Sequence, residues 1–514
     1  MMKRILAAAL ALVLLLSCCS ALADYDTHIS FTLNGTHTNS NMDYNHDAMY
    51  DYIAGMFNFD YEVFPVSKDA QADKIRTWIN GGTMPDTVTW RDFNYQEYVT
   101  FAEQGLIAAL PEGWETKYPD LYDMMHSSMS EEAFQKFYVD GALCGIAHAR
   151  NYRFNKVGTL VDHLSVYYRK DWAKELGFEF GDVITISQFK NYLRACIDKD
   201  MAKNGNTIGL TDEPGYMARF WMLFADVPYN KFHRTDNGYA WGFSDPSVLE
   251  ALKVANQWYA EGLLDKDFYM YQSENSISNF TSGLAAAFYH NCAVSSYLGY
   301  ATTFANNTGL NPDDCIAIAT IATDDGVTRA EETDNWWSVT MFNPDIEPEK
   351  LDRLLTMMNW ACTEEGEITI MLGLRGEIWD YDADHNIVML TEPDEKGNYA
   401  NTQDIYPSYS VFRTQGVNAD DFGFINPSND RKYVDPILRA YAVRDKGHIT
   451  FMDVNYAFFS SESKANFSVD LNDEFCKLTM GKAEDIEKDW NAFLEENKPL
   501  WQPVVDDLNA AFCK

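Results

Sequence analysis

Hydrophobic positions in the N-terminal part of the chain alternate between the periods of strands and of helices. Residues 28–33 and 61–66 read as strands, and residues 47–57 between them have helical spacing. A second helix is predicted over 70–80, where apolar side chains recur every three or four residues until a glycine pair ends it. A turn and then a short buried strand follow within 84–90. This β-α-β order predicts a mostly parallel sheet covered by helices, which is an α/β fold.

The same alternation continues through the rest of the chain. A strand is predicted at 166–169, followed by a helix for which Asp171 is the expected N-cap. Pro246 opens a strongly amphipathic helix, and 348–365 predicts another. Residues 483–512 are predicted to form a helical tail. No internal repeat or long low-complexity linker separates these segments, so we expect the units to pack against one another.

The first residues have the pattern of an export signal. Lys3 and Arg4 precede a 12-residue apolar run, and small residues lead to a predicted cleavage after Ala23, so that 1–23 is a signal peptide. Residues 15–18 also match a bacterial lipobox loosely, and in that alternative Cys18 would carry a lipid anchor. Either route predicts a protein at the extracellular face of the cytoplasmic membrane, secreted or anchored. No other run reaches the roughly 18 apolar residues of a spanning helix.

Composition and charge narrow the classes of protein further. The 514 residues are 46% hydrophobic, enough for a large core, and carry 77 acidic against 40 basic side chains for a formal charge of -37. Nucleic acid is therefore a poor partner, because binding a phosphate backbone requires positive surface. Seven cysteines remain after residue 23; they are scattered and odd in number, which predicts buried free thiols rather than disulfides. No metal-ligand spacing or cofactor motif is present, so neither a metal nor a cofactor is predicted.

Several stretches of the chain resemble one known family. Examples are KIRTWINGGTMPD at 74–86 and WYAEGLLDKDF at 258–268. In chain order the matching stretches are 74–86, 101–110, 168–177, 258–268, 280–286, 348–366 and 478–490. Each is weak alone, but their order spans nearly the whole mature chain. The sequence thus resembles the family 1 extracellular solute-binding proteins of ABC importers, in particular the long sugar-binding members of Gram-positive bacteria.

This resemblance implies a periplasmic-binding-protein-like α/β fold of type II, with two lobes joined by a multi-strand hinge and a cleft between them. It places 24–147 plus 290–342 in the first lobe, and 148–289 plus 343–514, with the helical tail, in the second. The implied function is capture of a carbohydrate, expected to be an oligosaccharide, between lobes that close on it. The implied partners are the membrane permease subunits of an ABC importer. We expect a monomer with no catalytic residues.

Sugar chemistry guides the choice of site residues, because sugars need flat rings for stacking and polar groups for their hydroxyls. The group 90–92 resembles a Trp-bearing ligand loop of the family, and the group around 216–221 resembles its aromatic wall. Trp221 lies in an apolar run that favours the core, and at most one of Trp336 and Trp337 is expected to face the cleft, because neighbouring strand residues point to opposite sides. The candidate ligand-binding residues are Asn34, Thr36, His37, Trp90, Arg91, Asp92, Arg150, Tyr152, Tyr216, Trp221, Trp336 and Trp337.

Alternatives remain open at this point. A secreted glycoside hydrolase would need two carboxylates across the scissile bond, for which Glu213 and Asp226 are candidates. A binding protein for peptides or other non-sugar solutes would use aromatic rings equally well. The run Asp380-x-Asp382-x-Asp384 begins like a calcium loop but lacks the later ligands, which favours a solvated acidic turn. An acidic sugar also remains an alternative ligand, because Arg91, Arg150 and Arg219 could contact its negative groups.

Overall fold

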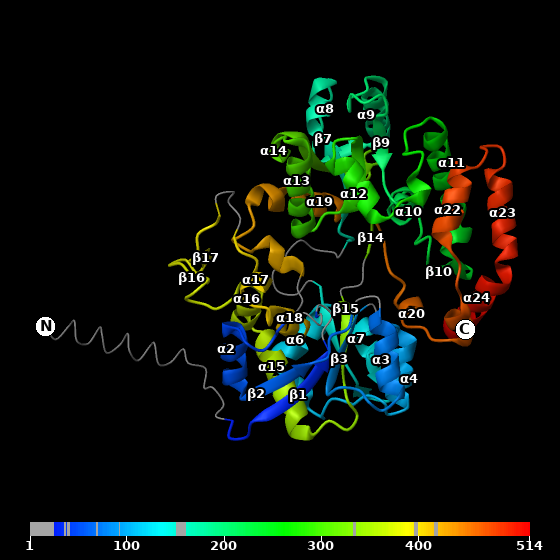
Figure 1. Cartoon of the computed structure of the whole chain (residues 1–514). Coiled ribbons are helices and arrows are strands. Elements are labelled where there is room, and N and C mark those ends of the chain that lie inside the picture. The colour runs from blue at the N-terminus through cyan, green and yellow to red at the C-terminus, as the bar shows by residue number, and fades with distance from the viewer. Residues whose placement is uncertain are drawn as a thin grey trace.

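Two five-stranded sheets, one above the other in Figure 1, organise the chain. The computed structural model describes residues 25–34, 38, 42–67, 70–91, 93–150, 161–332, 336–394, 399–415 and 420–513. The first sheet has the strand order β2 (Phe59–Val63), β1 (Ile29–Asn34), β3 (Thr87–Arg91), β15 (Trp336–Phe342) and β6 (Ile146–Ala149). The second has the order β8 (Val183–Thr185), β13 (Ile316–Ala322), β7 (Leu164–Arg169), β12 (Ala285–Asn291) and β9 (Ile208–Thr211). Each sheet is the centre of one lobe.

The first lobe is a β-α-β arrangement, as the hydrophobic pattern predicts. Strand β1 pairs in parallel with β2 and β3, while β15 runs antiparallel to both β3 and β6. Its other elements are α2 (Ala48–Phe57), α3 (Gln71–Asn80), α4 (Tyr95–Glu103), α5 (Trp114–Lys117), α6 (Pro119–Ser127), α7 (Glu131–Lys136), β4 (Tyr138–Val139), β5 (Ala142–Leu143), α15 (Pro348–Ala361), α16 (Glu364–Leu372), β16 (Trp379–Tyr381), β17 (Ile387–Met389), α17 (Thr402–Ile405) and α18 (Tyr409–Gln415).

The second lobe is built on a mixed sheet. Strand β7 lies antiparallel between β12 and β13, and β8 and β9 pair in parallel at the edges. Its other elements are α8 (Lys170–Glu175), α9 (Ile186–Asp198), α10 (Pro214–Met222), β10 (Phe232–Thr235), β11 (Gly238–Trp241), α11 (Pro246–Ala260), α12 (Ser273–Thr281), α13 (Val294–Thr308), α14 (Pro312–Cys315), α19 (Arg431–Arg444), α22 (Leu471–Met480), α23 (Ile486–Glu496) and α24 (Lys498–Phe512).

The lobes are joined by chain segments that lie side by side. Strand β14 (Arg329–Glu331) pairs in parallel with β18 (His448–Thr450), and Val161 forms a bridge with Glu332. Backbone bonds of 2.9 Å run from Asp162 N to Glu331 O and from Glu332 N to Thr450 O. The expected multi-strand hinge is therefore present, made of segments from three separate parts of the chain.

The division into lobes differs from the predicted one in two places. Residues 290–342 were assigned to the first lobe, but β13 lies inside the second sheet, where Ile318 pairs with Tyr167 of β7. Residues 343–514 were assigned to the second lobe, but α15, α16 and α18 contribute Leu354, Ile368 and Phe412 to the hydrophobic core of the first. Sheet membership depends on strand pairing, which the apolar pattern of a single segment does not specify.

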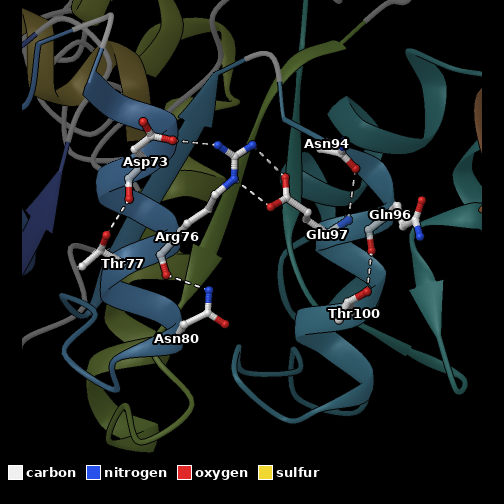
Figure 2. A network of polar contacts seen from close by, with 8 residues as sticks. All are labelled: Asp73, Arg76, Thr77, Asn80, Asn94, Gln96, Glu97 and Thr100. Carbon is white, nitrogen blue, oxygen red and sulfur yellow. Dashed lines mark hydrogen bonds and ion pairs between the residues drawn. The ribbon is translucent and has the colours of Figure 1, made fainter. Parts of the chain in front are cut away.

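Helices α3 and α4 are tied together across one face of the first sheet (Figure 2). Arg76 donates from Nε and Nη2 to the carboxylate of Glu97 at 2.7 and 2.9 Å, a two-pronged pair that fixes the orientation of both side chains. The same guanidinium lies 5.4 Å from the ring centre of Trp90. The Arg76–Glu97 pair therefore helps α3 and α4 to cover the face of the sheet on which Trp90 lies.

Most predicted helices are present, with shifted boundaries. The helix after β7 has Arg169 as its N-cap, and the expected cap Asp171 instead receives two hydrogen bonds from the Arg169 guanidinium. The 348–365 helix is split because the Thr363 side chain caps a new helix, α16. The tail is likewise two helices, α23 and α24, which meet at Asn497.

The cysteines behave as the sequence predicts. In the described part of the chain all seven are free, and six of them are buried; only Cys513 is partly exposed. Burial raises the pKa of Cys196 and Cys476 to about 12. No helix among the described residues is both long and apolar enough to span a bilayer.

Candidate functional site

Three of the candidate residues meet at one edge of the first sheet. Arg91 ends β3, Arg150 directly follows β6, and Trp337 lies at the start of β15, which runs antiparallel to both. The Arg91 guanidinium lies 5.6 Å from the ring centre of Trp337. All three side chains are partly exposed, so this edge offers a ring and two guanidinium groups.

Trp336 takes a different direction from Trp337. Its ring packs against Phe137 at 5.8 Å and Phe458 at 5.4 Å between ring centres. The strand is irregular at this point, because the register with β6 shifts between Trp336 and Ser338. Trp336 therefore joins an aromatic cluster, and Trp337 is the one that contacts Arg91.

Trp90, Trp221 and Asn34 are inside the lobes. Trp90 and Trp221 are each 1% exposed, and Asn34 is fully buried. Trp90 packs on Phe101 at 6.3 Å, and Trp221 packs edge-on against Trp258 at 4.9 Å. In this conformation these indoles serve the two hydrophobic cores and present no face to a solute.

Four candidates, Thr36, His37, Asp92 and Tyr152, lie outside the described residues. Their role in binding stays a prediction from the sequence.

The second lobe presents a ring cluster at the corresponding edge of its sheet. Tyr216, in the first turn of α10, lies on His290 of β12 with 4.2 Å between ring centres. His290 Nδ1 is 2.7 Å from the hydroxyl of Tyr300. Burial lowers the pKa of His290 to about 4, so the ring is neutral at physiological pH. Its Nε2 is buried and has no hydrogen-bond partner among the described residues.

Positive groups converge beside this cluster at the hinge. The pKa of His163 is lowered to about 4, first by burial and then by Arg150, Arg219 and Arg444. Arg444 is neutralised by Asp162, with a 2.9 Å contact between two buried side chains. Arg219 is exposed on α10, one turn after Tyr216. Sequence reasoning missed His163, just before β7, and His290, within β12, since a single histidine beside or within an apolar strand has no distinguishing pattern.

A cavity of about 360 Å³ lies between the lobes, at the side where α13 faces α16, α17 and α18 in Figure 1. The first lobe lines it with Met371, Leu372, Met389, Tyr399, Asn401, Thr402, Tyr409 and Arg413. Helix α13 lines it with Val294, Ser295 and Leu298, and the segment after α18 adds Phe422, which belongs to the core of the first lobe, and Asn426, Ser428 and Asn429. Pockets for small molecules occupy about 300–1,000 Å³, so this space suits a solute of one or a few sugar rings.

The polar groups of this interlobe cavity are arranged for a hydroxyl-rich solute. Within the described chain Asn426 uses only its Oδ1, which accepts from Ser428, and Asn429 uses only its Nδ2, which donates to Gly423 O. One amide donor and one amide acceptor therefore remain. Helix α13 begins here without a side-chain cap, which leaves first-turn N–H groups as further donors. The partly exposed rings of Tyr399 and Tyr409 supply apolar faces.

None of these cavity residues was a sequence candidate. Residues 399–429 fall in none of the stretches that resemble the family, and isolated amides between polar segments look like ordinary loops. Only the juxtaposition of α13 with α18, which are more than 100 residues apart in sequence, reveals them.

On the opposite side of the hinge the lobes are joined by aromatic rings. We call residues 454–467, which include α20 (Val454–Ala457) and α21 (Glu462–Asn466), the tail strap. Its Phe458 lies in the first lobe, with ring centres 4.9 Å from Tyr95 and 5.7 Å from Phe137. Its Tyr456 and Phe459 pack instead on Phe232 and Phe512 of the second lobe.

Polar contacts hold the tail strap in shape. The Lys464 ammonium donates to the carbonyls of Tyr456 at 2.6 Å and Phe459 at 2.9 Å. A hollow of about 410 Å³ beside the strap is lined by rings together with Asn94, Gln96 and Lys464, and the Oδ1 of Asn94 caps α4.

The carboxylates considered for hydrolysis have structural partners. Glu213 caps α10 through both oxygens, which accept from Gly215 N at 2.7 Å and Tyr216 N at 3.1 Å. Asp226 pairs with Arg329 at 2.7 Å. Neither forms part of the wall of the interlobe cavity.

The acidic run forms the turn between β16 and β17. Asp380 binds the Nε of Arg375 at 2.8 Å, and Asp382 accepts from the backbone N–H groups of Asp384 and Asn386. Among the described residues no group of three His, Cys, Asp or Glu side chains is placed to hold a metal ion.

Comparison with known proteins identifies the fold. No protein-family model matches the sequence, and no curated protein matches it either. Solved structures do match over most of their length. The alginate-binding protein AlgQ2, in a form without calcium, is 14% identical with a TM-score of 0.65, covering 95% of this chain and 99% of that one. The Streptococcus pneumoniae ABC-transporter substrate-binding protein FusA, in complex with kestose, is 16% identical with a TM-score of 0.61, covering 94% and 100%.

A third match supports the same fold. An HMO-binding, ABC-transporter-associated solute-binding protein from Bifidobacterium longum infantis is 14% identical, with a TM-score of 0.60, and the match covers 94% of this chain and 96% of that one. At these identities the likeness concerns the fold alone. The expected fold is thereby confirmed: the chain has the two-lobed, periplasmic-binding-protein-like α/β architecture with its hinge between the lobes.

Proposed function

We propose that this chain is a family 1 extracellular solute-binding protein, the substrate-binding component of an ABC importer, and that it captures an oligosaccharide between its lobes. The observation that carries the proposal is the interlobe cavity, whose wall combines rings, amides and a guanidinium from both lobes. The structural neighbours, which bind alginate, kestose and HMO, support it by their fold. The export signal predicted at 1–23 supports a place outside the cytoplasmic membrane.

The mechanism follows from the fact that residues of both lobes line the interlobe cavity. A solute that contacts α13 and α18 at once gains all its contacts only when the lobes are closed, so binding shifts the open–closed equilibrium by its difference in affinity for the two states. The permease then recognises the closed form. The side chains bind and orient the solute, and no bond of the sugar needs to break.

A thermal-shift screen with oligosaccharides, followed by calorimetry on the hits, tests the proposal. A sugar at 100 times its dissociation constant should stabilise the native state by about 2.7 kcal/mol. Chromatography of the recovered sugar separates binding from hydrolysis, since a binding protein returns the sugar intact. Stabilisation by peptides and not by sugars would instead favour a binding protein for peptides.

A further inference from the structure

A chain of hydrogen bonds inside the first lobe ends at helix α18, which supplies Tyr409 and Arg413 to the wall of the interlobe cavity. The chain begins at His148 of β6, whose Nε2 is 2.7 Å from the hydroxyl oxygen of Thr340 on β15. The Thr340 hydroxyl in turn lies 2.7 Å from the hydroxyl of Thr89 on β3. All three side chains are at most 1% exposed, so bulk water does not reach these contacts.

Thr89 joins this chain to the end of α18. Its hydroxyl oxygen is 3.3 Å from the carbonyl oxygen of Thr414 and 3.3 Å from the side-chain Nε2 of Gln415. The same Nε2 also donates to the carbonyl oxygen of Asn34 on β1 at 3.4 Å. Thr414 and Gln415 are the last two residues of α18, and each is 1% exposed. One hydroxyl on the middle strand of the sheet therefore holds two residues of this helix.

The chemistry of the donors and acceptors gives the chain one direction. The amide nitrogen of Gln415 can only donate and the carbonyl oxygen of Thr414 can only accept, so Thr89 accepts from the first and gives its single hydrogen to the second. The hydrogen between the two hydroxyls must then come from Thr340. Thr340 has no second hydrogen to give, so His148 must donate to it from Nε2. All these contacts are made together only when His148 has a hydrogen on Nε2.

We propose that Thr89 is a positioning residue for solute binding, which holds α18 where Tyr409 lines the interlobe cavity. The proposal rests on the proposed function. Val411 and Phe412 pack α18 into the core of the first lobe, but apolar attraction has no direction and leaves the helix free to shift along the sheet. A buried network with all its groups satisfied specifies one arrangement. A binding wall needs that precision, because contacts with a solute are lost when their supports move by a fraction of an ångström.

Two substitutions separate the hydroxyl of Thr89 from its methyl group. Thr89→Val keeps nearly the same shape and removes the hydroxyl, whereas Thr89→Ser keeps the hydroxyl and removes the methyl group. In calorimetry with kestose and alginate oligosaccharides as probes, we expect Thr89→Val to weaken binding about tenfold and Thr89→Ser to stay within about threefold of the native protein. Equal affinities of the native protein and the folded Thr89→Val variant would overturn the proposal.

Hydrogen exchange without any sugar tests the positioning itself. In Thr89→Val the backbone amides of 409–415 should exchange about tenfold faster than in the native protein, and in Thr89→Ser they should not. Helix α3 is the internal control, because its Gln71 donates to the backbone oxygen of Thr89 at 3.2 Å, a contact that neither substitution removes. Unchanged exchange in 409–415 overturns the positioning role. If neither probe binds the native protein while exchange responds as expected, the proposed function fails and the positioning of α18 stands.

Two further measurements keep the test decisive. If circular dichroism shows that Thr89→Val does not fold, Gln415→Met removes the contact from the helix side and should give the same changes in exchange and affinity, and their absence overturns the proposal. Nitrogen-15 NMR of the native protein should find a hydrogen on Nε2 of His148. A hydrogen on Nδ1 alone would overturn the proposal, because Thr89 could then not donate to Thr414 while it is bonded to Thr340.

Discussion

The two lobes meet in different ways on the two sides of the hinge. The interlobe cavity, between α13 and α18, is walled by amides, hydroxyls and an arginine around open space of about 360 Å³. The tail strap inserts Phe458 among rings of the first lobe and leaves it 8% exposed. An apolar contact of this kind is stable without any solute, whereas a polar wall around open space gains its contacts only when something fills it. The comparison indicates that stability of the lobe arrangement and response to solute belong to different sides of the molecule.

The largest expected effect concerns the strap. Phe458→Ala removes a buried ring from its contacts with Tyr95, Phe137 and Trp336, which should lower the free energy of unfolding by about 4 kcal/mol. Urea unfolding followed by circular dichroism measures it. Phe451→Ala, at a position 63% exposed just before the strap, is the control and should change stability by less than about 0.5 kcal/mol. If the two substitutions lower the free energy of unfolding equally, the tail strap does not stabilise the protein through Phe458.

Acid should act on the ring cluster of the second lobe, through His290. The pKa of His290 is about 4 in the folded chain and about 6.5 when unfolded, so between these values the unfolded state binds more protons. Stability should fall as pH drops from 6.5 to 4, by up to about 3 kcal/mol from this residue. In His290→Gln that part of the decline should be absent, as urea unfolding across this pH range would reveal. A parallel decline in both proteins would contradict the assignment.

A smaller effect is expected from the cavity wall. Tyr409→Ala removes a stacking ring that also accepts a hydrogen bond from Arg413 at 3.2 Å. Sugar affinity should fall about tenfold, equivalent to about 1.4 kcal/mol, while stability changes less than in Phe458→Ala. Tyr52→Ala, at an exposed position of α2, is the control. If calorimetry finds the same affinity in both variants, the cavity is not the sugar site.

The fold was predictable from the sequence because it depends on local periodicity and on the order of segments. Strand β1 and helix α3 appear close to their expected limits, since amphipathic spacing and a glycine stop are local properties. The lobe boundaries were not predictable in the same way, because β13 could pair in either sheet and only its partners decide.

The candidate site was harder to predict from the sequence than the fold, for a related reason. A tryptophan at the end of a strand has the same sequence context whether it faces a cleft or a core, and Trp90 lies in the core because α3 and α4 cover its face of the sheet. The residues of the interlobe cavity come from segments far apart in sequence, so their chemistry appears only after folding. Arg150 and Tyr216 were candidates because the resemblance puts them near a hinge crossing and in the aromatic wall, and their role in binding stays a prediction.

The buried thiols make this protein suited to a fluorescent reporter. A maleimide dye must reach a thiol to react with it, and six of the cysteines are buried and therefore inaccessible. Once Cys513 is replaced by serine, a single new cysteine at Ser295, exposed at the start of α13 on the cavity wall, would take up dye selectively. Its emission would then follow occupation of the cavity in real time, without purification of a labelled sugar.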